Sequence, residues 1–297
     1  LNTDRKLRAA ATKYTVFGRV RPDQKKRLVQ ALKAAGHKVA MTGDGVNDVL
    51  ALKEADCSIA MASGSEVATR VSQLVLLDSN FASMPYVVME GRRVINNIER
   101  AASLFLVKNI FSFLLAIISM IAVLPYPVTA AQLSLVSTLT IGVPSFFLAM
   151  EPNTEIVKGR FLKNVIFRAL PAGLTNVILV IGVMLFSMAF DLTHNELSTI
   201  SAIVLAEVGL IMLYCTCRPW STIRKLLWGA MCFAIIMCVL FFKELFALSP
   251  LDFGSRLVLV TLGLVAPPII RTISDILEFI NRKINENREA VKRRTLI

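Results

Sequence analysis

Two different patterns of hydrophobic and polar positions divide the chain. Up to Arg100, charges recur every few residues, and short apolar runs alternate with amphipathic stretches. From Ala101 onward, apolar blocks of roughly 20 residues alternate with short polar connectors, and each block is long enough to cross a bilayer as a helix. The pattern therefore predicts an α/β region followed by an all-α membrane region.

The first region reads as alternating strands and helices. β-branched and aromatic runs predict strands at 14–18, 39–41, 59–62 and 74–77. Pro22 near the first position of a helix and Gly36 after its end bound the first crossover, and helical patterns follow the second and third strands. Because strands that alternate with helices form parallel sheets, we expect a partial Rossmann-like fold.

A long amphipathic helix is expected from Ser83, and it runs without a breaker after Pro85 into the first apolar block. A continuous helix of this kind would be a stiff stalk, suited to carrying movement from a soluble domain into the bilayer. The predicted organisation is then a partial α/β domain, a stalk helix, a six-helix membrane domain and a basic cytosolic tail, at 1–82, 83–100, 101–280 and 281–297.

Six apolar blocks are candidate transmembrane helices, at 101–124, 131–150, 166–190, 197–217, 226–246 and 257–277. The connectors 124–130 and 191–196 contain no lysine or arginine, whereas 151–165 and the tail 281–297 are basic. Basic connectors stay on the cytosolic side. We therefore expect an integral multi-pass protein of the plasma membrane with both ends of the chain in the cytosol. The basic residues of the connector 151–165 are Lys158, Arg160 and Lys163.

The composition agrees with this topology. The 297 residues carry a formal charge of +12 and are 55% hydrophobic. The basic connectors and a tail near anionic lipid heads account for the charge, so no nucleic-acid partner is expected. The five cysteines form no secreted disulfide framework, and no cleavable signal peptide is recognisable. The first residue is not methionine, so we do not expect it to be a natural start.

One polar stretch follows the second predicted strand and is the candidate for chemistry. Asp44 and Asp48 are hard oxygen donors close enough in sequence to share one magnesium ion. Gly43 and Gly45 allow the backbone to approach a ligand where a Cβ would clash. Asn47 can donate to a phosphoryl oxygen without adding negative charge. Such a site lies beyond the carboxyl end of a strand, where open α/β sheets bind ligands; the alternative is a surface turn rich in Asp and Gly.

Lys25 is expected in the first turn of the first crossover helix. A lysine there can project toward the same crevice and neutralise a phosphoryl group as a point charge. The alternative is a solvated lysine within a short basic run.

Several polar side chains lie inside the predicted spans. Lys108 and Asn109 are in the first span and Glu207 is in the fourth. Ionisable groups at depth are costly and mark ion pathways or counter-ion sites, although Lys108 can instead reach back to the head groups. The second span carries Ser137 and Thr140 beside a Gly-Val-Pro sequence, which favours a kinked or locally unwound helix lining a cavity.

These motifs resemble those of one family. The sequence Thr42-Gly43-Asp44-Gly45-Val46-Asn47-Asp48, followed by Ala51-Leu52, resembles the hinge motif of P-type cation-transporting ATPases. The segments 21–25 and 74–81 resemble the stretch with the phosphate-binding lysine and the stretch that leads into the stalk helix. The resemblance covers nearly the whole chain. It implies the second half of a phosphorylation domain of the haloacid dehalogenase type, joined to membrane helices five to ten.

The resemblance also implies roles for individual residues. Asp44 and Asp48 would hold Mg²⁺, and Lys25 and Asn47 would act beside them on the phosphoryl group. The remaining residues of the motif that would line the cofactor site are Thr42, Gly43 and Gly45. No Asp-Lys-Thr-Gly-Thr occurs in the sequence. By this comparison the chain is a C-terminal fragment, inactive alone, whose missing N-terminal part would bind most of the ATP and form the aspartyl phosphate.

The cargo is expected to be a cation, with calcium as the best guess. Glu207 corresponds to a glutamate in the eighth helix of calcium pumps of this family, whereas the pair Lys108-Asn109 resembles lipid-translocating members. The candidate transport residues are therefore Lys108, Asn109, Ser137, Thr140 and Glu207. Three alternatives remain open: a lipid- or polyamine-translocating pump, a membrane-anchored magnesium-dependent phosphatase, and a catalytically silent truncated membrane protein.

Overall fold

The computed structural model describes residues 4–157 and 159–294. Lys158 and the last three residues of the predicted tail lie outside the described residues. The chain forms two compact units, Leu1–Met89 and Glu90–Ile297.

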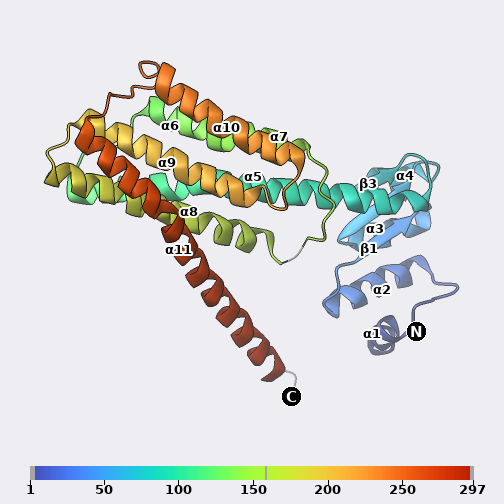
Figure 1. The fold of residues 1–297 in the computed structure, drawn as a ribbon. Helices are drawn as coiled ribbons and strands as arrows, with labels where there is room; N and C mark the ends of the chain where they lie inside the picture. The colour runs from blue at the N-terminus through green and yellow to red at the C-terminus, as the bar shows by residue number, and fades with distance from the viewer. Residues whose placement is uncertain (1–3, 158, 295–297) are drawn as a thin grey trace. The chain divides into compact units, whose positions relative to one another are not determined.

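The N-terminal unit contains a small parallel sheet (Figure 1). Its strands pair in the order β1-β2-β3, with Thr42 opposite Ile59 and Ile59 opposite Leu74. This confirms the predicted parallel sheet with helical crossovers. The elements are α1 (Asp4–Lys13), α2 (Pro22–Ala34), β1 (Ala40–Gly43), the 3-10 helix η1 (Val46–Asp48), α3 (Val49–Glu54), β2 (Cys57–Met61), α4 (Glu66–Val71), β3 (Leu74–Leu76) and the 3-10 helix η2 (Phe81–Ser83).

Two small apolar clusters hold this unit together. Leu52 of α3, Ala60 of β2 and Ala68 of α4 are fully buried against one another. Leu7 of α1 and Ala31 of α2 form the second cluster. Small residues at these contacts let the helices lie close to the sheet.

The prediction of a strand at 14–18 is wrong. The segment has no regular structure, Val16 is 86% exposed, and Arg19 turns the chain with φ 54°. A strand needs a neighbour for its backbone N–H and C=O groups. Within the described residues, this segment pairs with none of the three strands. The β-branched and aromatic composition of residues 14–18 was therefore not sufficient to predict a strand.

Helix α5 (Met84–Ala122) is helical throughout, from the predicted stalk into the first predicted span. Polar side chains fix the turn at residues 78–83 that leads into α5. The Ser83 hydroxyl donates to Asp78, and the Asn80 side chain accepts from the N–H of Ala82 at 3.0 Å. The hydrogen bonds from the Ser83 hydroxyl and the Asn80 N–H hold the pKa of Asp78 below its usual value.

The second unit is all-α, and six helices of the described chain are long and apolar enough to cross a membrane, which confirms the six predicted spans. In Figure 1, α11 crosses α8 and α9 and continues as one helix well into the predicted tail. The helices after α5 are α6 (Ala130–Ser137), the π-helical turn η3 (Thr138–Gly142), α7 (Val143–Met150), α8 (Phe161–Ala189), α9 (His194–Thr216), α10 (Thr222–Phe241) and α11 (Phe253–Arg294).

Local sequence explains where two of these helices begin. Thr129 before α6 and Thr193 before α9 each form a capping box with the residue three positions later, which satisfies helix N–H groups that have no intrahelical acceptor. Helices α8 and α9 are the most buried and form the centre of the bundle. Between α6 and α9, the buried Ser198 hydroxyl donates to Gln132 at 2.6 Å.

Candidate functional site

The carboxyl ends of the three parallel strands gather the loops of the N-terminal unit. The N–H of Ser65, after β2, donates to the backbone oxygen of Asp44, after β1, at 2.6 Å. The N–H of Ser63 donates to the hydroxyl of Ser79, after β3, at 2.8 Å. Since the polar loops of all three strands meet at this edge, it is the position at which α/β sheets bind ligands.

An ion pair links two of the predicted site residues. Lys25 Nζ, in the first turns of α2, lies 2.6 Å from Asp48 Oδ1 in η1. The Asp48 side chain is 10% exposed and that of Lys25 is 35% exposed, so the pair lies at the edge of the protein interior. The charge-assisted hydrogen bond fixes one carboxylate oxygen and leaves Oδ2 available as an acceptor.

The glycine at the end of β1 makes room for this carboxylate. A Cβ added to Gly43 would lie 2.5 Å from the Cβ of Asp48 and 2.9 Å from its Oδ2. A Cβ on Gly45 would meet its nearest atoms at 3.9 Å, an ordinary contact. The first glycine is therefore required by packing, and the second is not.

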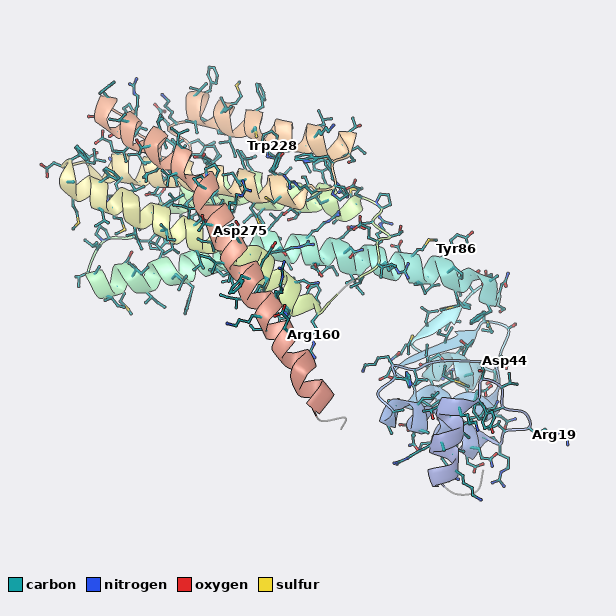
Figure 2. The ribbon with its side chains drawn as sticks, turned by 60° about the horizontal axis from the view of Figure 1, so that its bottom comes forward. Arg19, Asp44, Tyr86, Arg160, Trp228 and Asp275 are labelled. Carbon is teal, nitrogen blue, oxygen red and sulfur yellow. The ribbon has the colours of Figure 1, made fainter. Side chains whose placement is uncertain are left out.

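The other residues of the motif are arranged differently. Asp44, labelled in Figure 2, and Asn47 have exposed side chains, and neither side chain forms a hydrogen bond with another described residue. Thr42 is half-buried within β1. The structure therefore brings Lys25 and Asp48 into direct contact and leaves Asp44 and Asn47 facing solvent.

The donor set fits a magnesium ion that shares its coordination with a ligand. No group of three or more His, Cys, Asp or Glu side chains capable of holding a metal occurs among the described residues. A closed protein cage is therefore not formed by this part of the chain. Mg²⁺ is usually held by one or two carboxylates together with phosphate and water oxygens, and Asp44 and Asp48 provide two carboxylates of that kind.

Sequence reasoning missed the part played by the turn after β2. A Cβ on Gly64 would lie 2.4 Å from the backbone oxygen of Asp44, so only glycine fits there. Ser65 binds the same oxygen through its N–H and caps α4 by accepting from the N–H of Ala68 at 3.1 Å. A Gly-Ser pair one residue after the strand predicted at 59–62 was the available signal.

In the membrane unit, a small cavity collects polar side chains from four helical segments. It has a volume of about 20 Å³, which is room for one water molecule. Lys108 of α5 lines it together with Ser137 of α6, Thr140 of η3 and Asn176 of α8. Three of the five predicted transport residues are therefore gathered here.

Asn176 was not predicted, although an amide in the middle of an apolar span is a readable signal. It is 4% exposed, and its Oδ1 has no hydrogen-bond partner in the described part of the structure. The Thr140 hydroxyl donates to the backbone oxygen of Val136 at 2.7 Å, within its own helix. Both residues thus present oxygen atoms with free lone pairs beside the cavity.

The remaining two predicted transport residues lie elsewhere. Asn109 is exposed, because successive helical residues point about 100° apart and Lys108 faces the cavity. Glu207 is half-buried and does not line the cavity. It lies between Leu205 and Gly209 in the sequence of α9, and since these two residues line the cavity, the Glu207 side chain points away from the cavity. Its carboxylate packs against α11, where a Cβ on Gly263 would lie 2.7 Å from Oε2.

The second span is irregular where a kinked or locally unwound helix was expected, but it stays helical. Residues Thr138–Gly142 form a π-helical turn that ends two residues before Pro144. Proline cannot donate an N–H and displaces the preceding turn, and π-turns of this kind occur often at functional sites. The turn positions Thr140 against Gly209 of α9, where a Cβ would lie 2.8 Å from the Thr140 side chain.

Comparisons with known proteins agree with the motifs. Residues 3–56 match the family model of haloacid dehalogenase-like hydrolases. The chain is 42% identical over 76% of its length to "Probable cation-transporting ATPase exp7" of Streptococcus pneumoniae, covering 30% of that protein. It is 39% identical over 90% of its length to "Calcium-transporting ATPase CtpE" of Mycolicibacterium smegmatis, covering 36% of it. It is 38% identical over 68% of its length to "Cation-transporting ATPase pma1" of Synechocystis, covering 24% of it. The chain thus spans about a third of the length of the curated relatives it matches.

Proposed function

This chain belongs to the P-type cation-transporting ATPases, and from that premise we propose that it acts as the C-terminal part of a longer pump. The pump would couple ATP hydrolysis, through an aspartyl-phosphate intermediate, to transport of a cation, and we propose calcium as that cation. The observation that carries the proposal is the 39% identity, over 90% of the chain, to a protein named as a calcium-transporting ATPase.

In this proposal the N-terminal unit supplies part of the phosphoryl site. Lys25 orients Asp48 through their 2.6 Å contact and adds a positive charge for a phosphoryl oxygen. Asp44 and Asp48 are the residues that would hold magnesium. When bound, Mg²⁺ would neutralise phosphoryl charge and fix its orientation. Asn47 is exposed beside them and can donate an N–H to a phosphoryl oxygen.

The membrane unit would supply part of the transport route. Ser137, Thr140 and Asn176 bring oxygen atoms to one cavity, and oxygen is the donor that calcium prefers. The ammonium group of Lys108 lines the same cavity and would repel a cation there, so cation entry would require this side chain to move. We further propose that the protein resides in the plasma membrane with both ends of this chain in the cytosol, because the basic connectors alternate with connectors that are uncharged, acidic or, at 243–256, charge-balanced.

The proposal is tested in the longer protein, reconstituted in sealed vesicles. ATP turnover and uptake of radioactive calcium are measured as the calcium concentration rises. Both should increase together. Asp48→Asn and Lys25→Met should each lower turnover on the order of 100-fold, because each removes a charge aimed at the phosphoryl group.

The matched control is Asp56→Asn. Asp56 lies at the opposite edge of the same sheet, where its carboxylate accepts from the N–H of Val39 at 2.9 Å, and asparagine keeps that acceptor. This variant should retain turnover. If turnover did not depend on calcium, the assigned cargo would be wrong; if Asp48→Asn kept full turnover, the assigned site would be wrong.

A further inference from the structure

A buried arginine without a partner lies in the membrane unit. Arg100 of α5 is 5% exposed, and its Nη1 atom is buried without a hydrogen-bond acceptor. It forms neither a hydrogen bond nor an ion pair with any residue that the structure describes. A guanidinium carries five N–H donors and stays charged, and burying such a group without compensation costs several kcal/mol. An acceptor from outside the described chain would remove that cost.

Arg100 lines a pocket large enough to admit such an acceptor. The pocket has a volume of about 590 Å³ and is formed by residues of α5, α8, α9 and α11 and of the segments that follow α7 and α9. Two further arginines line it, Arg168 of α8 and Arg218 just after α9. We call Arg100, Arg168 and Arg218 the arginine pocket. Asp275 in Figure 2 marks the part of α11 that passes this pocket, one residue after the lining residue Ser274.

The acidic residues nearby do not pair with Arg100. Glu99 lies 3.7 Å from Arg168 and also accepts from the Asn164 amide at 3.1 Å. Glu151 is engaged by Arg224 at 2.6 Å. Glu155 and Glu278 line the pocket, and neither forms an ion pair with its arginines. With Arg168 paired to Glu99, the other two arginines share the pocket with Glu155 and Glu278, and Arg100 remains without an ion-pair partner among the described residues.

The surroundings match the level of lipid head groups. Arg218 stacks on the ring of Tyr214 at 5.3 Å, and Tyr214 contacts Trp220 and Trp228. Clusters of tyrosine and tryptophan at the ends of spans mark the membrane–water interface. Apolar side chains also line the pocket, among them Phe167, Ile270 and Leu277.

We propose that the arginine pocket binds a phosphate group, carried by an anionic membrane phospholipid or free in solution. The guanidinium fork of Arg100 matches two phosphate oxygens, and basic pockets between transmembrane helices bind lipid phosphates. The half-buried Asn281, whose Oδ1 also lacks a partner among the described residues, lines the same pocket and offers an N–H donor from its amide. The site is independent of the proposed transport function, because it requires only the membrane unit.

The test measures binding to the purified chain in neutral detergent. Two probes are titrated separately, a short-chain phosphatidylglycerol and inorganic phosphate, with short-chain phosphatidylcholine as the zwitterionic comparison, and the thermal unfolding midpoint is followed. Phosphatidylglycerol should raise the midpoint. Arg100→Gln should weaken its binding roughly 10- to 100-fold, the loss expected for one or two charge-assisted hydrogen bonds.

Arg256→Gln is the matched control, because Arg256 is exposed at the far end of α11 and outside the pocket. It should bind the probes as the unchanged chain does. If Arg100→Gln does not fold, the exposed Arg168→Gln and Arg218→Gln carry the same test and should each weaken binding. Binding of phosphatidylglycerol alone identifies a lipid as the source, whereas binding of both probes shows that the phosphate suffices. If neither probe binds, or if no pocket variant weakens binding, the proposal is wrong.

Discussion

At the scale of single residues, the site depends on the space above Gly43. The Asp48 side chain fills the position that a Cβ at Gly43 would occupy, and this packing holds the carboxylate against Lys25. The Asp48 carboxylate is therefore positioned in two ways: the charge of Lys25 attracts it, and the lack of a side chain at Gly43 leaves room for it.

Replacement of Gly43 or Gly45 by alanine should have unequal effects on stability. Gly43→Ala should destabilise the N-terminal unit by about 1–3 kcal/mol, the usual cost of overpacking, because the new methyl group would lie 2.5 Å from Asp48. Gly45→Ala should change stability by less than about 0.5 kcal/mol, because its methyl group meets only ordinary contacts. Thermal unfolding in detergent compares the two variants. Equal midpoints would show that the loop yields freely and that packing does not position Asp48.

The types and spacing of the residues were enough to predict a candidate site, but the surroundings of each side chain could not be predicted from the sequence. The spacing of Asp44 and Asp48 predicts a shared role, and it gives no sign that one carboxylate is buried against a lysine while the other faces solvent. Likewise the sequence shows an amide at Asn176 within the third apolar block and an arginine at Arg100 just before the first, but it does not show their surroundings. What makes them unusual is the lack of a partner in the described structure, which depends on how neighbouring helices pack.

At the scale of elements, an asparagine ties the middle of α5 to the end of α7. The Nδ2 of Asn97 donates to the backbone oxygens of Ala149 and Glu151, at 2.9 and 3.0 Å. Carbonyls in the last turn of a helix have no intrahelical donor, so this side chain supplies a cap from a different helix.

Removal of this cap should loosen the contact between the two helices. Asn97→Ala should destabilise the membrane unit by about 1–3 kcal/mol, because two carbonyls lose their donor in a buried position. Asn109→Ala, in the same helix but exposed, is the control and should leave the thermal midpoint unchanged. A midpoint for Asn97→Ala equal to that of the control would mean that water replaces the side chain without loss.

Elements with a strong period were predictable, and isolated ones were not. The six apolar spans and the alternation of strands and helices follow directly from the sequence pattern. The strand expected at 14–18 failed because strand formation needs a partner, which no local pattern supplies. The Gly-Val-Pro sequence predicted a break, whereas its π-helical form depends on how η3 packs against α9.

At the scale of the whole chain, the distribution of basic residues predicts its orientation. The orientation can be tested with single cysteines introduced at one acidic and one basic connector. The five native cysteines are first replaced by alanine. A membrane-impermeant maleimide applied to intact cells should label His194→Cys, at the start of α9 beside the acidic residues Asp191 and Glu196. It should label Lys225→Cys, near the basic start of α10, only after lysis. The reverse pattern would mean that both ends of the chain face outward.

The π-helical turn has a consequence for any change in chain length nearby. A π-turn accommodates one residue more than an α-helical turn, so loss of a single residue such as Leu139 would let α6 and α7 fuse into one regular helix. Everything beyond the deletion would then rotate by about 100° and shift by about 1.5 Å. Pro144 and the wall formed by α7 would turn to face different neighbours. The extra residue therefore sets the angular phase between the two halves of this span, and a shortened helix of unchanged composition would present a different surface to the rest of the bundle.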